Sequence, residues 1–298
     1  MFLSKIPQDG CKLNEGYRYI DIACRAARIA SEKLAQWFGR LESNSIENKS
    51  VNDWVSAADH AAEEAIIGLL QRETPNFAIL TEETGYLPGQ GQGSAYCWIV
   101  DPLDGTTNFI RGFPLWAVSV ALEHRPDRNR KWGEIIAGTI DIPLFKETFF
   151  AIKGEGAYRN NDLILPKAQS RPVDEALLCT GFPFRAQEYR EPYLKLFGKV
   201  MAECANVRRP GAVTIDLCYT ALGTFDGFWE LDLSPWDIAA GALIIQEAGG
   251  RTANFLDSID FLSSGDIVAG RTPVFERLLE LTQTYFPSPR DVNKAPLR

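Results

Sequence analysis

The chain has 298 residues, 45% hydrophobic and 23% charged, which is the composition of an ordinary globular protein. Its net charge of −8 disfavours a nucleic acid as partner, because the phosphate backbone would be repelled. An acidic protein can still bind a phosphate ester where metal ions supply local positive charge. No segment offers the roughly 20 apolar residues of a membrane helix, and we expect neither a signal peptide nor a membrane partner.

The cysteines show no C-x-x-C spacing, which disfavours a zinc ribbon or a redox pair. They stand at Cys11, Cys24, Cys97, Cys179, Cys204 and Cys218. Free thiols are typical of a reducing compartment, so the sequence predicts a cytoplasmic protein.

The first part of the chain predicts two helices followed by a sheet. Apolar residues recur at helical spacing over residues 17–38, and a second helix is expected over 57–72. The polar stretch 41–53 predicts a loop, and the glycine-rich stretch 84–94 a mobile segment. Weak alternation of apolar and polar residues favours an antiparallel sheet. Its strands are expected at 77–80, 96–100, 117–123, 134–141, 147–152 and 157–159.

A second α/β segment begins near Leu177. It predicts helices at 188–205, 212–222 and 235–248, with strands at 206–209 and 227–230. We therefore divide the chain into a polar leader (1–16), a metal-binding α+β half (17–170), a C-terminal α/β half (171–290) and a polar tail (291–298).

Four acidic side chains stand where predicted strands end or a helix begins. They are Glu82, Asp101, Asp104 and Asp237. An α/β scaffold places its chemistry at such ends, and a carboxylate at the end of a buried strand is costly unless it is paired or metal-bound. Hard oxygen donors of this kind suit Mg²⁺, and two such ions can clamp an in-line displacement.

Gly105-Thr106-Thr107 follows the central acidic pair directly. Gly105 allows close backbone approach, and the amides after it can face a phosphate. The Thr106 hydroxyl is placed to orient an attacking water. Taken singly, each pattern is more often a turn, a solvated acidic pair or the first turn of a helix. Their combination favours the metal site.

Two longer motifs carry a resemblance to a known family. Residues 98–109 read W-I-V-D-P-L-D-G-T-T-N-F, and residues 236–250 read W-D-I-A-A-G-A-L-I-I-Q-E-A-G-G. With Glu82-Glu83 before them and V-S-A-A-D at 55–59, they resemble a bacterial-type inositol monophosphatase, within the superfamily of fructose-1,6-bisphosphatase. The resemblance runs over residues 17–282. It implies an α/β fold layered as an α-β-α-β-α sandwich, the sugar-phosphatase fold.

The resemblance also implies roles for individual residues. Two or three Mg²⁺ ions would be held by Glu82, Asp101, the Leu103 carbonyl, Asp104 and Asp237, with Glu82 contacting the first two. Thr106 and Glu82 would activate the water, with Asp59 supporting Thr106. Lys49 and Asp53 would lie in a loop that helps to hold a third metal.

Substrate contacts are also implied, from Asp104, Gly105, Thr106, Gly211, Ala212, Val213 and Glu230. For Arg208, an ion pair across a dimer and a substrate contact are equally open.

The expected reaction is Mg²⁺-dependent hydrolysis of a small phosphorylated metabolite by water, with inositol-1-phosphate as the leading substrate. Histidinol phosphate is the second candidate, and a sugar bisphosphate or 3′-phosphoadenosine phosphate the third. A non-catalytic regulatory scaffold is the alternative outside the enzymes. A homodimer and inhibition by lithium are further expectations from the family.

Overall fold

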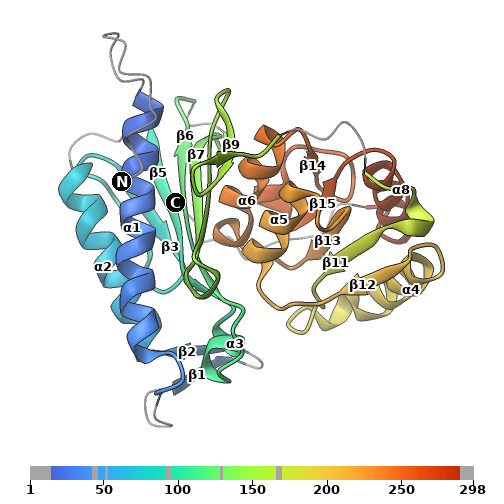
Figure 1. Cartoon of the computed structure of the whole chain (residues 1–298), viewed down its shortest axis with the longest axis horizontal. Helices are drawn as coiled ribbons and strands as arrows, with labels where there is room; N and C mark the ends of the chain where they lie inside the picture. Colours follow the sequence, from blue (N-terminus) through green and yellow to red (C-terminus); the bar gives the residue numbers. More distant parts are fainter. Residues whose placement is uncertain are drawn as a thin grey trace.

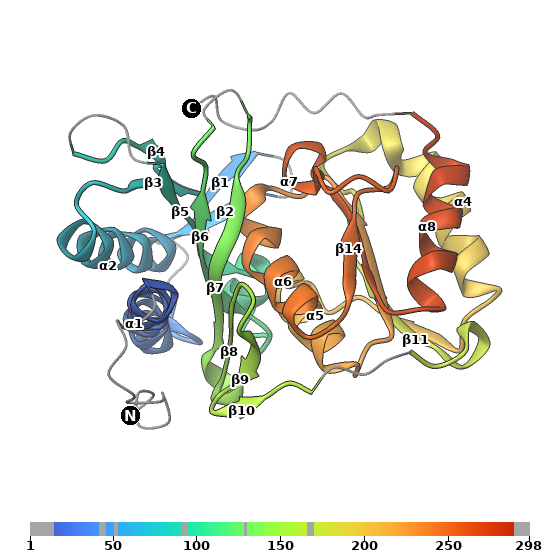
Figure 2. The ribbon, with the colours of Figure 1, turned by 90° about the horizontal axis from the view of Figure 1, so that it is seen from above.

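The computed structural model describes residues 15–41, 46–50, 53–90, 95–127, 130–165 and 170–288. Helices and sheets alternate in five layers along the long axis of the molecule (Figure 1). A helix pair, an eight-stranded sheet, a second helix pair, a five-stranded sheet and a third helix pair follow one another (Figure 2). The α-β-α-β-α sandwich expected from the sequence is confirmed.

The outer helix pair consists of α1 (Glu15–Trp37) and α2 (Ala57–Glu73). Both helices match the predicted ranges closely. α1 buries a stripe rich in alanine, including Ala23, Ala26 and Ala30, against the large sheet. Small side chains along this stripe let the helix axis approach the strands closely, so the apolar period of the sequence becomes the contact between the first two layers.

The large sheet has the strand order β10-β9-β8-β7-β6-β5-β3-β4, and only β3 and β5 pair in parallel. The expected antiparallel character is therefore confirmed for most of the sheet. Its strands are β3 (Ala78–Thr81), β4 (Gly85–Leu87), β5 (Tyr96–Asp104), β6 (Ala117–His124), β7 (Glu134–Ile142), β8 (Glu147–Ile152), β9 (Gly156–Arg159) and β10 (Asp162–Leu163).

The middle layer consists of α5 (Val213–Leu222) and α6 (Pro235–Glu247). Both helices are apolar on nearly every face, as expected for helices enclosed between two sheets. A Cβ added to Gly138 of β7 would lie 3.0 Å from the Ala240 Cα. The absence of a side chain at Gly138 thus sets how closely α6 approaches the large sheet.

The second sheet has the order β12-β11-β13-β15-β14 and mixes parallel and antiparallel pairs. Its strands are β11 (Leu177–Thr180), β12 (Asn206–Arg208), β13 (Gly227–Leu231), β14 (Arg251–Ala253) and β15 (Asp266–Gly270). The third helix pair, α4 (Arg190–Met201) and α8 (Val274–Tyr285), packs on the outer face of this sheet. The sequence analysis assigned no element beyond residue 250, so it missed β14, β15, α8 and the short α7 (Phe261–Ser264).

The structure corrects three expectations. The predicted loop 41–53 contains a hairpin of β1 (Ile46–Ser50) and β2 (Asp53–Ser56), which pair only with each other and so need no apolar period. Within the supposedly mobile stretch, β4 forms an edge strand, while residues 91–94 lie outside the described residues. β5 also continues past its predicted end to Asp104. None of the described helices combines the length and apolar character needed to cross a membrane.

Candidate active site

The end of β5 carries the central acidic pair. Asp101 and Asp104 are 2% and 8% exposed, and the pairing of β5 with β6 shifts register between them. This irregularity aims two carboxylates of one strand into the same space. The backbone N–H of Leu103 donates to Asp101 Oδ1 at 3.0 Å and fixes that side chain.

Gly105 turns the chain from β5 into the short helix α3 (Thr106–Ile110). Its φ of 85° lies in the left-handed region, which residues other than glycine rarely adopt. A Cβ at this position would also lie 2.8 Å from the Leu115 carbonyl oxygen. Both the conformation and the space therefore require glycine where the backbone approaches the acidic pair.

Helix α5 binds Asp104 through its first turn. The backbone N–H of Thr214 donates to Asp104 Oδ2 at 2.8 Å, and the Thr214 hydroxyl donates to the same oxygen. The first N–H groups of a helix have no partner within the helix, so a carboxylate is a favourable acceptor there. These two bonds join the end of the large sheet to the middle helix layer.

Asp237 is held at the start of α6. Ser234 caps the helix, Pro235 occupies its first turn, and the Ser234 N–H donates to Asp237 Oδ2 at 2.7 Å. Burial, and after it the Asp104 carboxylate, raise the pKa of Asp237 to about 7. The interpretation of this residue as a plain helix cap is therefore incomplete, because the cap faces other acids.

Thr106 lies against Asp59, which is 1% exposed on α2. The Thr106 hydroxyl has two acceptors, Asp59 Oδ1 at 3.3 Å and the Leu103 carbonyl at 3.0 Å. Asp59 Oδ2 accepts from the Ser56 N–H at 2.9 Å and from its hydroxyl at 2.5 Å. Burial raises the pKa of Asp59 to about 6 despite these bonds. Asp59 stands behind Thr106 rather than in the cavity wall.

Glu82 lies in the turn between β3 and β4, and a residue that the sequence analysis missed holds that turn. Glu63 of α2 is 3% exposed. It accepts hydrogen bonds from the N–H of Glu83 at 3.1 Å, the N–H of Thr84 at 3.2 Å and the Thr84 hydroxyl at 2.7 Å, and also from the Thr81 hydroxyl. Asp59 and Glu63 are one helical turn apart on the predicted second helix, and this spacing of two acids was the available signal.

We expect Glu63→Gln to weaken this turn. With the glutamine oxygen in the place of Oε1, the NH2 group in the place of Oε2 cannot accept from the Thr84 hydroxyl. The remaining bonds to a neutral oxygen are also weaker than bonds to a carboxylate. The free energy of unfolding should fall by about 1–2 kcal/mol in chemical denaturation, and kcat should fall because the turn carries Glu82. Glu64→Gln, a change at the exposed neighbour, is the matched control and should alter neither quantity.

A cavity of about 350 Å³ collects these groups. Every proposed metal ligand and every proposed substrate residue lines it: Glu82, Asp101, Leu103, Asp104, Gly105, Thr106, Gly211, Ala212, Val213, Glu230 and Asp237. The side chains of Lys49 and Asp53, expected near a third metal, lie outside the described residues. Segments far apart in the chain thus meet at one site, as the sequence pattern predicted.

The acids in this cavity repel one another. The pKa of Asp101 is raised well above its usual value, first by burial and then by Glu82, Asp104 and Asp237. Burial also raises the pKa of Asp104. Within the described ranges, no three acidic, histidine or cysteine side chains already form a metal-binding group. Mg²⁺ usually takes one or two carboxylates and completes its shell with water and substrate oxygens, so this donor set fits it.

The other end of the cavity has a different character. Glu230 of β13 is 8% exposed, and burial raises its pKa to about 8. Asp216 of α5, which the sequence analysis missed, is 1% exposed and lines the same cavity. The guanidinium of Arg209 lies 5.5 Å from the ring centre of Phe184. This end of the cavity therefore combines acids, a cation and aromatic faces.

Arg208 does not line the cavity. Its Nη1 donates to Asn206 Oδ1 at 2.7 Å and to the Val207 carbonyl at 3.1 Å, so it stays on its own strand. The neighbouring Arg209 lines the cavity instead. Asn108, a third missed residue, donates to the Pro210 carbonyl at 3.1 Å and to the Leu115 carbonyl at 2.8 Å. It thereby fixes the segment that leads to Gly211.

Comparison with known proteins agrees with this geometry. Residues 17–285 match the inositol monophosphatase family. The Nus factor SuhB of Pseudomonas aeruginosa is 41% identical over 270 residues, covering 90% of this chain and 97% of that protein. The inositol-1-monophosphatase of Mesorhizobium japonicum is 39% identical, covering 88% of this chain and 94% of that protein.

A similar solved structure is the extragenic suppressor protein suhB of Bartonella henselae, at 35% identity and a TM-score of 0.82. It covers 89% of this chain and 98% of that one. The inositol monophosphatase of Anabaena has 31% identity and a TM-score of 0.76, with 91% and 97% covered. The chain therefore belongs to the inositol monophosphatase family.

Proposed function

We propose that the protein hydrolyses inositol-1-phosphate to inositol and phosphate, with Mg²⁺ as its cofactor. The observation that carries this proposal is the meeting of Glu82, Asp101, Asp104 and Asp237 in one cavity of about 350 Å³. Phosphoryl transfer needs positioning and charge stabilisation more than covalent chemistry. A cluster of buried acids that repel one another is suited to holding cations for that purpose.

Mg²⁺ ions would be held by these four carboxylates and the Leu103 carbonyl. When bound, they supply positive charge to the phosphate oxygens and make water more acidic. Each of the three aspartates already has one carboxylate oxygen fixed by a backbone N–H. Such fixed side chains lose little conformational freedom when a cation is added, which favours binding.

Thr106 positions the attacking water in this proposal. A hydroxyl has a single hydrogen, and that of Thr106 is directed at Asp59 or at the Leu103 carbonyl. Its lone pairs are then left to accept a hydrogen bond from water. The water oxygen forms the new bond to phosphorus while its proton passes to Glu82. The bond from phosphorus to the ester oxygen breaks, and solvent protonates the departing alkoxide to give the alcohol.

The backbone from Gly105 to Thr107 and the segment from Gly211 to Val213 line the same cavity. We assign the phosphate to the first and the alcohol to the second. Glu230 then accepts a hydrogen bond from a hydroxyl of the alcohol. A polyol such as inositol presents several hydroxyls to this acid, which is why inositol-1-phosphate leads over the other candidates.

Gly181→Ala tests the role of Glu230 without changing an acid. A Cβ at Gly181 would lie 1.8 Å from Glu230 Oε1, so the carboxylate must move away. We expect KM for inositol-1-phosphate to rise about tenfold, the cost of one lost hydrogen bond, with kcat little changed. Gly198→Ala is the control, because a Cβ there meets nothing within 4 Å. An unchanged KM in steady-state kinetics would remove Glu230 from the substrate site.

The proposed function is tested by measuring phosphate release with and without Mg²⁺. The substrates are inositol-1-phosphate, histidinol phosphate, fructose-1,6-bisphosphate and 3′-phosphoadenosine 5′-phosphate. We expect Mg²⁺-dependent release, fastest from inositol-1-phosphate, and inhibition by lithium. Preference for another substrate would keep the metal chemistry and reject the inositol assignment. No release from any of them would reject both.

The name of the Pseudomonas relative supports a second candidate, a role as a Nus factor. This role is the regulatory alternative to an enzyme, and the two roles are compatible in one chain. A strain in which the chromosomal gene carries Asp104→Asn separates them. If the regulatory role is independent of catalysis, such a strain differs in phenotype from a deletion strain.

We also propose a homodimeric, cytoplasmic protein without a nucleic-acid ligand. The net charge of −8 supports the absence of nucleic-acid binding. Sedimentation of the purified chain at micromolar concentration gives the oligomeric state directly, and a monomer there would reject the dimer.

A further inference from the structure

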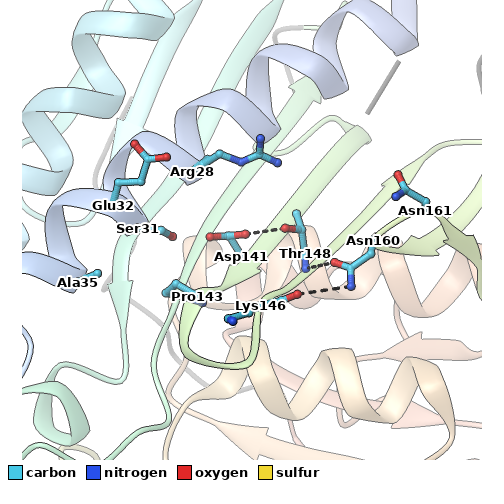
Figure 3. Close-up of a pocket in the computed structure, with 10 residues that line it drawn as sticks. All are labelled: Arg28, Ser31, Glu32, Ala35, Asp141, Pro143, Lys146, Thr148, Asn160 and Asn161. Carbon is cyan, nitrogen blue, oxygen red and sulfur yellow. Dashed lines mark hydrogen bonds between the residues drawn. The ribbon is translucent and has the colours of Figure 1, made fainter. Parts of the chain in front are cut away.

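A second hollow lies where α1 passes the ends of β7 and β8, and it shares no lining residue with the candidate active site. Its volume is about 510 Å³, within the range of small-molecule sites. α1 forms one wall, and the turn from β7 to β8 and the turn after β9 form the other. Figure 3 shows its lining residues: Arg28, Ser31, Glu32, Ala35, Asp141, Pro143, Lys146, Thr148, Asn160 and Asn161.

Hydrogen bonds fix the strand side of this hollow. Asn160 Oδ1 accepts from the Thr148 N–H at 2.9 Å, and Asn160 Nδ2 donates to the Lys146 carbonyl at 3.4 Å. The Thr148 hydroxyl donates to Asp141 Oδ1 at 2.6 Å. The wall is therefore formed before anything binds, which lowers the entropic cost of binding.

The floor of the hollow has two buried polar side chains, of which one lacks a hydrogen-bond partner. Ser31 is 3% exposed and Asp141 is 8% exposed. Among the residues that the structure describes, Ser31 Oγ has no hydrogen-bond partner. Its hydroxyl and the Asp141 carboxylate point toward each other across the floor (Figure 3). A buried polar group without a partner costs about 1–3 kcal/mol, so a ligand that satisfies it gains that amount.

The chemistry of the floor selects a donor-rich cation. An ionised carboxylate only accepts hydrogen bonds, and a hydroxyl oxygen also accepts them. A primary ammonium carries three N–H donors, enough for both groups at once, and its charge balances that of Asp141.

The rim of the hollow carries more positive than negative side chains, so it favours an anionic group of a ligand. Arg28 from α1 and Lys146 from the turn bring two cations to the hollow, against the two acids Asp141 and Glu32. The Glu32 carboxylate is turned away from Asp141 in the close-up (Figure 3). A guanidinium pairs well with a carboxylate or a phosphate. The charged lining groups together are neutral: Asp141 is the buried acid of the floor, and the exposed Arg28, Lys146 and Glu32 give the rim a net charge of +1.

We propose that this hollow binds a small zwitterion of the amino-acid class, with its ammonium on Asp141 and Ser31 and its acid group toward Arg28 and Lys146. This site is separate from the phosphatase site and does not depend on the function assigned there.

Calorimetric titration of the full chain tests the proposal with glycine, β-alanine and 4-aminobutyrate. Propylamine and propionate are the controls that carry one charge only. We expect at least one zwitterion to bind saturably with Kd below about 1 mM. Each singly charged control should bind at least about tenfold more weakly. Failure of all three zwitterions to saturate overturns the proposal.

Variants of the lining residues test whether the zwitterion binds in this hollow. Asp141→Asn, Ser31→Ala and Arg28→Gln should each weaken it about tenfold or more. Asp174→Asn, at an exposed acid distant in sequence, should leave it unchanged. Asp104→Asn should also leave it unchanged, because Asp104 belongs to the other cavity. If Asp141→Asn does not fold, Ser31→Ala and Arg28→Gln decide the result. Full affinity in those two variants, or loss of binding in Asp104→Asn, would overturn the assignment.

Discussion

Asp104→Asn is expected to lower kcat for phosphate release by about 10³-fold or more, the size seen when a group that stabilises transition-state charge is removed. The substitution keeps the shape of the side chain, and its amide oxygen still accepts from the Thr214 N–H. What it loses is the negative charge that would hold a cation beside Asp101 and Asp237. Steady-state kinetics with inositol-1-phosphate at saturating Mg²⁺ measures the effect.

The same variant should fold, and in the absence of metal it should be at least as stable as the parent. Burial together with the neighbouring acids raises the pKa of Asp101 and of Asp237, which means that their charged forms are unfavourable. Removing one charge relieves that repulsion. Thermal unfolding in a chelator checks this, and Asp174→Asn serves as the exposed control. Full activity of Asp104→Asn would refute the metal assignment. A large loss of stability would mean that the fall in kcat cannot be attributed to the lost charge.

The metal-free protein is expected to lose stability as pH rises from about 5 to 8. Burial raises the pKa of Asp59 to about 6, of Asp237 to about 7 and of Glu230 to about 8. In the unfolded chain these acids titrate near pH 4. Between the two values the folded state holds more protons than the unfolded state, so the free energy of unfolding falls as pH rises. Each group contributes a slope of at most about 1.4 kcal/mol per pH unit.

Denaturant unfolding in a chelator at several pH values measures this slope. The window stays above pH 5 because Glu203 has its pKa lowered to about 2 by hydrogen bonds from Arg277 and Lys199, and its contribution is lost only at lower pH. Asp237→Asn should flatten the upper part of the slope, and millimolar Mg²⁺ should flatten it in the parent chain. Stability that rises over this window in the metal-free protein would contradict the burial of these acids.

The sequence predicted most of the fold because its signals were local. The apolar period of α1 and the short apolar strands β5 and β6 were readable from spacing alone. The β1–β2 hairpin was not, since its strands pair with each other and carry no apolar pattern. The elements after residue 250 are short, apart from α8, and were left unassigned. The layer order came from the family resemblance.

The residues of the candidate site also divide into those that local sequence signals mark and those that they do not. Asp101, Asp104 and Asp237 stand out in sequence because acids next to Gly, Pro or Trp interrupt apolar runs. Glu63, Asp216 and Asn108 act through contacts with segments distant in the chain, and no spacing marks Asp216 or Asn108. Glu63 was within reach, since it follows Asp59 by one helical turn. Asp216 sits in an apolar helix, where a lone acid reads as an exposed position until the fold shows it to be 1% exposed.

The bonds from Thr214 to Asp104 bear on when the candidate site is assembled during synthesis and folding. Residues 101–104 are synthesised well before α5 and α6, so a nascent chain carries only half of the proposed cation site. Docking of the middle helices brings Asp237 and the Thr214 donors to the end of β5. We therefore expect chains truncated before α5 to release no phosphate.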